Sequence, residues 1–203
     1  MYYYGHGAER NGAEALKWAE MGVDAGSTEA MVYLAALYGS GFGVPRDKDK
    51  QMKLLEEAAE QGNVHGIYNS GMVFYFGHGR QQDYAAAMEI FRQAADLGYD
   101  LAMYRIGDLY YYGYGAPVDY AQALEWYSRA ADNGLIFAYY IVGQMYYKGT
   151  GTDVDYAAAA ECFLKGAEGG DSDAMKKLAF MYENGVGVEK DPEKAKYWYD
   201  KAG

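Results

Sequence analysis

A Gly-x-Gly pair recurs along this chain of 203 residues at a constant interval of 36 residues. The first glycines of these pairs are Gly5, Gly41, Gly77, Gly113, Gly149 and Gly185. A constant period of roughly 20 to 50 residues indicates that one supersecondary unit is repeated and stacked on its neighbours. The interval therefore predicts a single elongated repeat array, and it argues against a globular enzyme.

Each period contains two apolar patterns with the spacing of an α-helix. One pattern follows a residue of helix-capping type, namely Asn11, Asp47, Asp83, Asp119, Asp155 or Asp191. The side-chain oxygen of Asn or Asp accepts free backbone N–H groups of a first helical turn. Glycines that favour a helix end stand after this pattern, at Gly26, Gly62, Gly98, Gly134 and Gly170. The other pattern ends at the next Gly-x-Gly.

These helices are predicted to form antiparallel pairs in an all-α chain. In each pair the first helix ends at a Gly-x-Gly and the second helix follows a capping residue. Five complete pairs are expected, over residues 27–60, 63–96, 99–132, 135–168 and 171–202. A partial repeat, residues 1–26, precedes them and contains an unpaired second helix over roughly 11–23.

The two ends of the array give different signals. Met1 to Tyr4 match the last turn of a further first helix, so we expect the chain to be a fragment of a longer array. A genuine start with a frayed first turn is the alternative. Near the other end, Lys196 occupies a position that is apolar in the earlier second helices, which predicts a capping helix with a polar outer face.

Composition excludes several classes of partner. The chain has 18 Lys and Arg residues against 29 Asp and Glu residues, a net charge of −11, and its basic residues form no cluster. Nucleic acid and anionic membrane surfaces are therefore poor candidates. No apolar run approaches the ~20 residues of a membrane span, and no signal peptide opens the sequence. The compartment stays open, with a cytoplasmic location slightly favoured.

The residues that could carry chemistry have simpler structural explanations. The Gly-x-Gly pairs follow helices, whereas a dinucleotide-binding loop follows a strand. His6 and His78 are two repeats apart, too far to share a metal ion. Cys162 shares its position with three tryptophans, which predicts a buried cysteine and a core role for Trp18, Trp126 and Trp198. The acid pairs Asp153/Asp155 and Asp171/Asp173 are expected to cap helices. We therefore predict no enzymatic activity, no cofactor and no metal.

The segments 178–188 (LAFMYENGVGV) and 190–202 (KDPEKAKYWYDKA) resemble the Sel-one-like repeat family, a branch of the tetratricopeptide-type α-solenoids. The resemblance extends over essentially the whole chain. It implies a right-handed α-α superhelical solenoid of 36-residue helix-turn-helix repeats, with the first helices lining the concave side. It also implies work as a scaffold or adaptor. Some bacterial relatives carry a disulfide in each repeat, and this chain lacks those cysteines.

In tetratricopeptide-type arrays one face of the first helix lines the ligand groove. When this sequence is matched to the register of the family, the resemblance implies the same groove on its first helices. In the three central repeats this face holds aromatic residues that the flanking repeats lack. The predicted partner-binding residues are His65, Tyr68, Met72, Tyr75, Phe76, Leu101, Tyr104, Asp108, Tyr111, Tyr112, Phe137, Tyr140, Gln144, Tyr147 and Lys148. Two rows of tyrosines recur among them, Tyr68/Tyr104/Tyr140 and Tyr75/Tyr111/Tyr147, and a helical wheel places both away from the face that packs on the second helix.

The partner expected in this groove is a protein or an extended peptide, because tyrosine offers a rigid ring and a hydroxyl for recognition. Nearby acids would favour a partner with apolar and basic residues. Three alternatives stay open: the rings only fill gaps between neighbouring first helices, the groove stacks on sugars in a cell-envelope or carbohydrate-associated module, or His65 is simply exposed. The chain is expected to be a monomer, or to self-associate weakly through the exposed ends of the array.

Overall fold

The computed structural model describes residues 11–78 and 81–203, and every regular element in them is an α-helix. The helices are α1 (Gly12–Asp24), α2 (Thr28–Ser40), α3 (Lys48–Glu60), α4 (Val64–Phe76), α5 (Tyr84–Asp96), α6 (Asp100–Tyr112), α7 (Tyr120–Asp132), α8 (Ile136–Lys148), α9 (Tyr156–Glu168), α10 (Ser172–Asn184) and α11 (Pro192–Ala202). The predicted helical turn at residues 1–4 and His6 lie outside the described residues.

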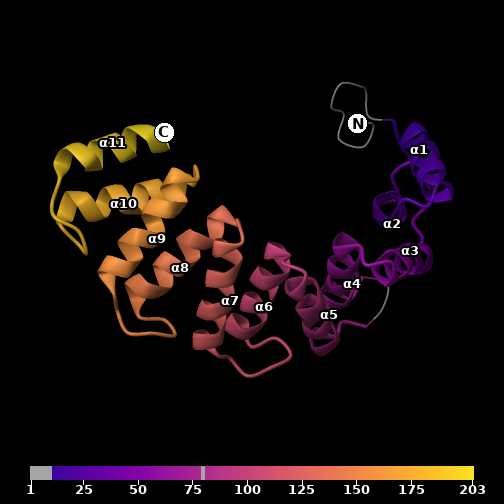
Figure 1. Cartoon of the computed structure of the whole chain (residues 1–203), viewed down its shortest axis with the longest axis horizontal. Coiled ribbons are helices and arrows are strands. Elements are labelled where there is room, and N and C mark those ends of the chain that lie inside the picture. The colour runs from indigo at the N-terminus through magenta and orange to yellow at the C-terminus, as the bar shows by residue number, and fades with distance from the viewer. Residues whose placement is uncertain (1–10, 79–80) are drawn as a thin grey trace. The chain divides into compact units, whose positions relative to one another are not determined.

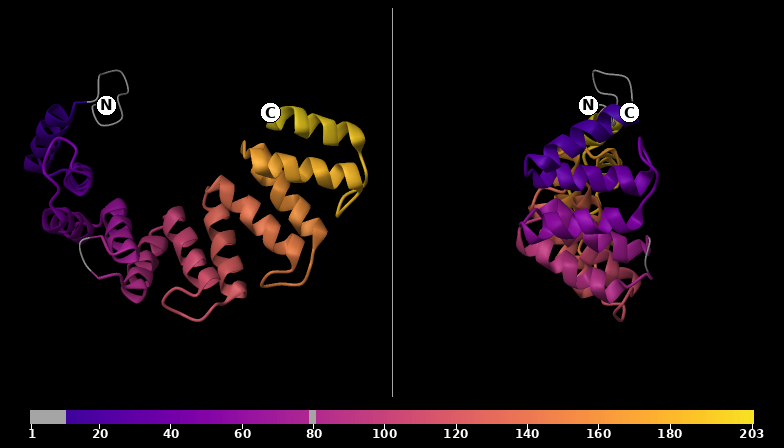
Figure 2. Two further views of the ribbon diagram at one scale, coloured as in Figure 1. Left: turned by 180° about the vertical axis from the view of Figure 1, so that it is seen from behind. Right: turned by 90° about the vertical axis from the view of Figure 1, so that its right-hand side faces the viewer.

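The chain divides into two compact units, Met1–Leu97 and Gly98–Gly203. In the first unit α2 packs on α3 and α4 packs on α5; in the second unit α6, α8 and α10 pack on α7, α9 and α11 (Figures 1 and 2). Within each unit the second helix of a pair also packs on the first helix of the next pair. This sequential packing of helix pairs confirms the predicted all-α solenoid.

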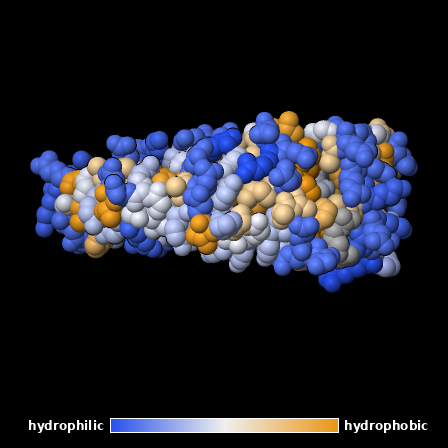
Figure 3. All heavy atoms as spheres, turned by 90° about the horizontal axis from the view of Figure 1, so that it is seen from below, coloured by the Kyte–Doolittle hydropathy of each residue, from blue (hydrophilic) through white to orange (hydrophobic). Residues whose placement is uncertain are grey.

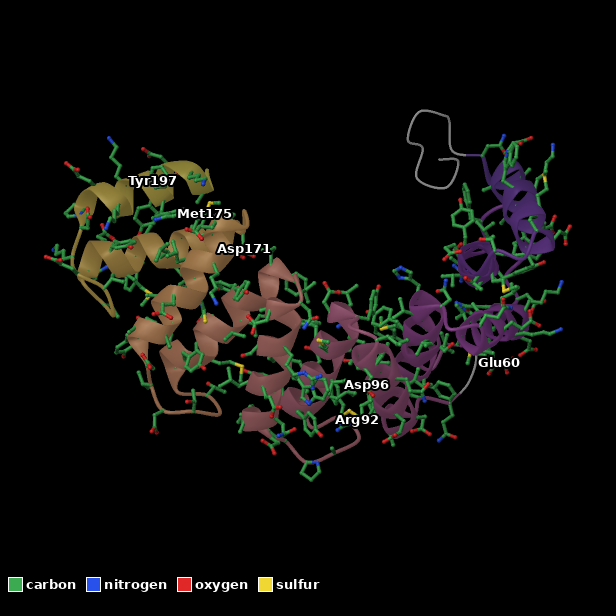
Figure 4. The ribbon with its side chains drawn as sticks, in the orientation of Figure 1. Glu60, Arg92, Asp96, Asp171, Met175 and Tyr197 are labelled. Atoms are coloured by element: carbon green, nitrogen blue, oxygen red, sulfur yellow. The ribbon has the colours of Figure 1, made fainter. Side chains whose placement is uncertain are left out.

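The predicted capping residues begin the helices as expected. Asp119 and Asp155 each accept a hydrogen bond from the backbone N–H three residues later, at 3.0 and 2.9 Å. Asp191 caps α11, whose first residue is Pro192. Asp171 caps α10 by accepting from the N–H of Ala174 at 2.7 Å (Figure 4). These bonds satisfy backbone donors that a helix start leaves without partners.

The two glycines of each Gly-x-Gly have different roles. The first one ends a helix in the left-handed conformation, as Gly149 does after α8 with φ of 67°. The second one, such as Gly151 with φ of 76°, lies directly against the backbone of the preceding pair's second helix. A Cβ on Gly151 would overlap the carbonyl oxygen of Tyr120, the first residue of α7. The turn therefore fixes how one repeat sits on the repeat before it.

The core lies between the two helices of each pair and also between neighbouring pairs, as where buried residues of α7 meet buried residues of α8. Gly71, Gly107 and Gly143 on the first helices face the rings of Phe91, Tyr127 and Phe163 on the second helices, and a Cβ on any of these glycines would approach the ring within 2.6 to 2.7 Å. Glycine therefore lets each ring lie flat against the opposite helix. Phe91 and Phe163 are fully buried in this arrangement.

One tryptophan prediction is wrong. Trp126 and Trp198 are buried, but Trp18 is 54% exposed. Cys162 on α9 occupies the position equivalent to these tryptophans, and it lies near Tyr139 on α8 and Asp132 on α7. This position therefore faces the first helix of its own pair and the second helix of the pair before. No helix precedes α1 in residues 11–78, so Trp18 lacks those neighbours there.

The face seen in Figure 3 is largely hydrophilic, with apolar residues in small separate patches. Lys196 is exposed on α11, as expected for the polar face of a last helix. Among the described helices, none combines the length and the apolar character that crossing a bilayer requires.

Candidate functional site

The second unit has a pocket of about 180 Å³ between α6, α7 and α8. It is lined by Tyr104, Asp108, Tyr111 and Tyr112 from α6, by Tyr127 from α7, by Tyr140, Ile141, Gln144, Met145 and Lys148 from α8, and by Thr150 from the following turn. Seven of the predicted partner-binding residues line it: Tyr104, Asp108, Tyr111, Tyr112, Tyr140, Gln144 and Lys148. Of the other predicted residues in this unit, Leu101 is half-buried, Phe137 is exposed and packs on Tyr104, and Tyr147 packs on Tyr156.

The first row of tyrosines packs against the second helix of its own pair. The ring centroids of Tyr104 and Tyr127 are 5.3 Å apart, and those of Tyr140 and Phe163 are 5.8 Å apart. The expectation that this row faces away from the second helix is therefore wrong. The physical reason is the glycine one turn later, such as Gly107, which lets the ring of the second helix reach this side of the first helix.

The second row also packs within its own pair. Tyr111 contacts Tyr120 edge to face at 5.1 Å, and Tyr147 contacts Tyr156 at 5.0 Å. Both rows thus hold their helix pairs together, and only parts of their rings reach the surface. Tyr112 differs, because its side chain is 57% exposed at the edge of the pocket.

Asp108 is a buried carboxylate at this pocket. Its residue is only 5% exposed. Nη1 of Arg105 donates to its Oδ2 at 2.8 Å, and the hydroxyl of Tyr127 donates to its Oδ1 at 2.8 Å. Burial raises the pKa of Asp108, and the hydrogen bonds from Tyr127 and Arg105 oppose that rise. Tyr104 is a further hydrogen-bond partner of this carboxylate. The charge is therefore held in place by charge-assisted hydrogen bonds from three side chains.

This network occurs in one repeat of the described chain. The residues equivalent to Asp108 and Tyr127 are Met72 and Phe91 in the repeat before, and Gln144 and Phe163 in the repeat after. The sequence analysis named Asp108 but missed Tyr127 and Arg105. Two positions depart together from the repeat pattern, since Asp108 replaces a neutral residue and Tyr127 replaces a phenylalanine of the neighbouring repeats. This joint change is the signal that could have identified the network.

The hydroxyls of Tyr104, Tyr112 and Tyr127 stay protonated at neutral pH. Burial, and next the charge of Asp108, raise the pKa of Tyr104 to about 12. The same two causes raise the pKa of Tyr112 and of Tyr127. Within α8, Nε2 of Gln144 donates to the hydroxyl of Tyr140 at 3.0 Å. The site therefore offers aromatic rings together with hydrogen-bond donors and acceptors.

The first unit has its own pocket, of about 250 Å³, on the same face of its first helices. It is lined by Val32, Ala35, Ala36, Gln51, Leu55, Asn69, Met72, Val73, Phe76 and His78. Of the predicted residues in this unit, Met72 and Phe76 line the pocket and His65 is exposed. Tyr68 is buried against Phe91, and Tyr75 packs on Tyr84. No carboxylate is among the residues that line this pocket.

Cys162 lines neither of these two pockets. Cys162 lies on α9, and burial raises the pKa of its thiol to about 11, so it is a weak nucleophile at neutral pH. Within residues 11–78 and 81–203, no three His, Cys, Asp or Glu side chains are grouped so that they could hold a metal ion. The arrangement can bind a ligand by shape, stacking and hydrogen bonds.

The raised pKa of Asp108 predicts a pH-dependent stability difference between the wild type and Asp108→Asn. A carboxyl whose pKa is higher in the folded than in the unfolded state contributes stability below its unfolded pKa and loses that contribution as pH rises through its folded pKa. The free energy of unfolding of the wild type, minus that of the variant, should therefore fall as pH rises above the ordinary carboxyl value of 3.8. Urea titrations of both proteins between pH 3.5 and 7 would measure it. A difference that rises with pH would show that Arg105 and Tyr127 outweigh burial.

Comparison with known proteins places these features in a family. The Sel1 repeat matches residues 1–27, 28–63, 64–99, 100–135, 136–171 and 172–203. A comparison with curated proteins gave no match. Among solved structures, a protective antigen of uropathogenic Escherichia coli strains with an SLR fold is 31% identical, with a TM-score of 0.86 over 99% of this chain. The chain spans 43% of the length of that antigen.

Two further structures show the same architecture. A Sel1 repeat protein from Oxalobacter formigenes is 32% identical, with a TM-score of 0.78 over 87% of this chain and 72% of that one. An immunity protein from Pseudomonas aeruginosa shares the fold at 21% identity, with a TM-score of 0.59 over 96% of this chain and 75% of that one. Because the repeat matches the whole sequence in register, the chain belongs to the Sel1 repeat family.

Proposed function

We propose that this chain is a non-catalytic scaffold or adaptor that binds a segment of a partner protein, or an extended peptide, on the faces of its first helices. The observation that carries the proposal is the pocket of the second unit, where residues of α6 and α8 that recur in the repeat pattern line one hollow. Exposed aromatic rings beside hydrogen-bonding groups are typical of recognition surfaces.

The packing of the tyrosine rows decides which residues can test this function. Tyr104 and Tyr140 pack on rings of the second helices, so their removal would change stability as well as binding. Tyr112 is the better choice because its side chain is 57% exposed. Tyr197 on α11 is a matched control, since it is 56% exposed in the same unit and does not line the pocket (Figure 4).

The test begins with peptides selected from a random library displayed on phage, using the whole chain as bait. We expect Tyr112→Ala to weaken the selected peptides at least ~10-fold, as for an aromatic hot spot, and Tyr197→Ala to leave their affinity unchanged. Isothermal titration calorimetry measures both affinities, and thermal melting checks that the two variants remain folded.

Two results would contradict the proposal. One is a set of selected peptides that bind both variants as well as the wild type, which would place binding elsewhere. The other is a failure to select peptides together with Tyr112-dependent binding on a glycan array. That second result would support the carbohydrate-associated alternative, in which the same rings stack on sugars.

A further inference from the structure

We propose that the pocket of the second unit receives a lysine side chain of the bound segment, with the lysine ammonium at Asp108 and its methylene groups against the tyrosine rings. This inference rests on the proposed function and names the chemistry of its partner. It concerns α6, α7 and α8 alone, so it depends on the internal arrangement of one unit.

The shape and lining of the pocket suit a long side chain with a charged end. Tyr104, Tyr112 and Tyr140 supply aromatic surface around the hollow, and Asp108, which is only 5% exposed, supplies a carboxylate in its lining. Aromatic faces attract cations, and the attraction is stronger where water is excluded. A lysine stem can lie along apolar surface while its ammonium reaches a polar group.

The charge of Asp108 acts on the hydroxyls around the pocket in spite of the ion pair with Arg105. The charge of Asp108 raises the pKa of Tyr104, Tyr112 and Tyr127, second only to burial in each case. Arg105 acts in the opposite direction at Tyr104, and its effect there is smaller than that of Asp108. Burial is the larger cause of each raised pKa, and Lys148 is a cation in the lining of the same pocket. The part that Asp108 adds shows that its charge acts on the hydroxyls around it.

The hydrogen bonds of Asp108 favour lysine over arginine as the incoming residue. Oδ2 already accepts from the planar guanidinium of Arg105, and Oδ1 accepts from Tyr127. A second guanidinium would bind best through two parallel hydrogen bonds, one to each carboxylate oxygen, and both oxygens already accept hydrogen bonds. An ammonium is a compact charge with three donors, so it needs only a remaining lone pair of Asp108 and neighbouring phenolic oxygens.

The test uses three blocked peptides, Ac-Ala-Ala-X-Ala-Ala-NH₂, in which X is lysine, ε-N-acetyl-lysine or norleucine. Each is titrated into the ¹⁵N-labelled full chain and followed by two-dimensional NMR. The lysine peptide should shift the amide signals of residues 108–112 and 144–148 in a saturable way. The two uncharged peptides should bind at least ~10-fold more weakly, because a loss of one charge-assisted contact corresponds to about that factor.

Variants then assign the effect to the carboxylate. The triple variant Arg105→Ile/Asp108→Gln/Tyr127→Phe gives α6 and α7 the residues that α8 and α9 already have in Ile141, Gln144 and Phe163, so the fold should tolerate it. It should lose at least ~10-fold in affinity for the lysine peptide. Asp200→Asn removes one exposed negative charge from α11 and should change nothing. Lys148→Gln removes a cation from the pocket and should strengthen binding.

Three outcomes would overturn the inference: equal binding of the norleucine peptide, signals that shift only outside α6, α7, α8 and the turn after α8, or unchanged binding by the triple variant while circular dichroism shows it folded. The test separates this inference from the proposed function. If peptides selected on phage bind through Tyr112 but show no lysine requirement, the proposed function stands and the lysine pocket is wrong. If no selected peptide depends on Tyr112, the proposed function itself is wrong.

Discussion

Gly151→Ala should destabilise the second unit by more than about 3 kcal/mol. Gly151 has φ of 76°, a conformation that costs an L-residue roughly 1–2 kcal/mol. Its new Cβ would also overlap the carbonyl oxygen of Tyr120 and come within 2.8 Å of the backbone N of Ala121. Backbone atoms of α7 cannot rotate aside as a side chain can, so the turn must move away from the preceding pair. Urea titration followed by circular dichroism measures the loss.

Gly170→Ala is the matched control for this experiment. Gly170 has φ of 95° in the same unit, and a Cβ there would meet nothing within 4 Å. It therefore reports the backbone strain alone, about 1–2 kcal/mol. If both variants lose the same stability, the contact between the Gly-x-Gly turn and α7 does not hold neighbouring repeats together.

Most of the fold follows from local chemistry that repeats. A capping Asp, a helical apolar pattern and a left-handed glycine each act within a few residues, so their recurrence predicts the helices and their pairing. The contact of Gly151 with Tyr120 joins two different repeats, and periodicity alone does not show it. Trp18 illustrates the same limit, because burial of an equivalent position depends on a preceding neighbour.

The candidate site was predictable in its location and less so in its chemistry. The family register placed Tyr104, Asp108 and Tyr140 on one face, and these residues do line one pocket. A helical wheel treats the first helix in isolation, so it missed the rings that reach across from the second helix. The hydrogen bond from Tyr127 on α7 to Asp108 on α6 joins residues that are 19 positions apart, so it forms only when the two helices are packed together.

The dependence of the pocket on the second helices leads to the last prediction, a loss of about 3–5 kcal/mol of stability in Phe163→Ala. Phe163 is fully buried on α9, its ring lies against Gly143, and Tyr140 packs on it at 5.8 Å. Removing the ring leaves a cavity that rigid helix backbones fill only in part. Urea titration of the full chain gives the change in the free energy of unfolding.

Phe180→Ala separates this packing effect from the general loss of a phenylalanine. Phe180 is 41% exposed on α10 in the same unit, so its removal should cost less than ~1 kcal/mol. Phe163 does not line the pocket, yet Phe163→Ala should also weaken peptides that depend on Tyr112, because Tyr140 loses the ring that holds it at the pocket wall. If Phe163→Ala keeps wild-type affinity while losing stability, the wall formed by Tyr140 takes no part in binding. If both substitutions cost the same stability, the buried ring is not what joins α8 to α9.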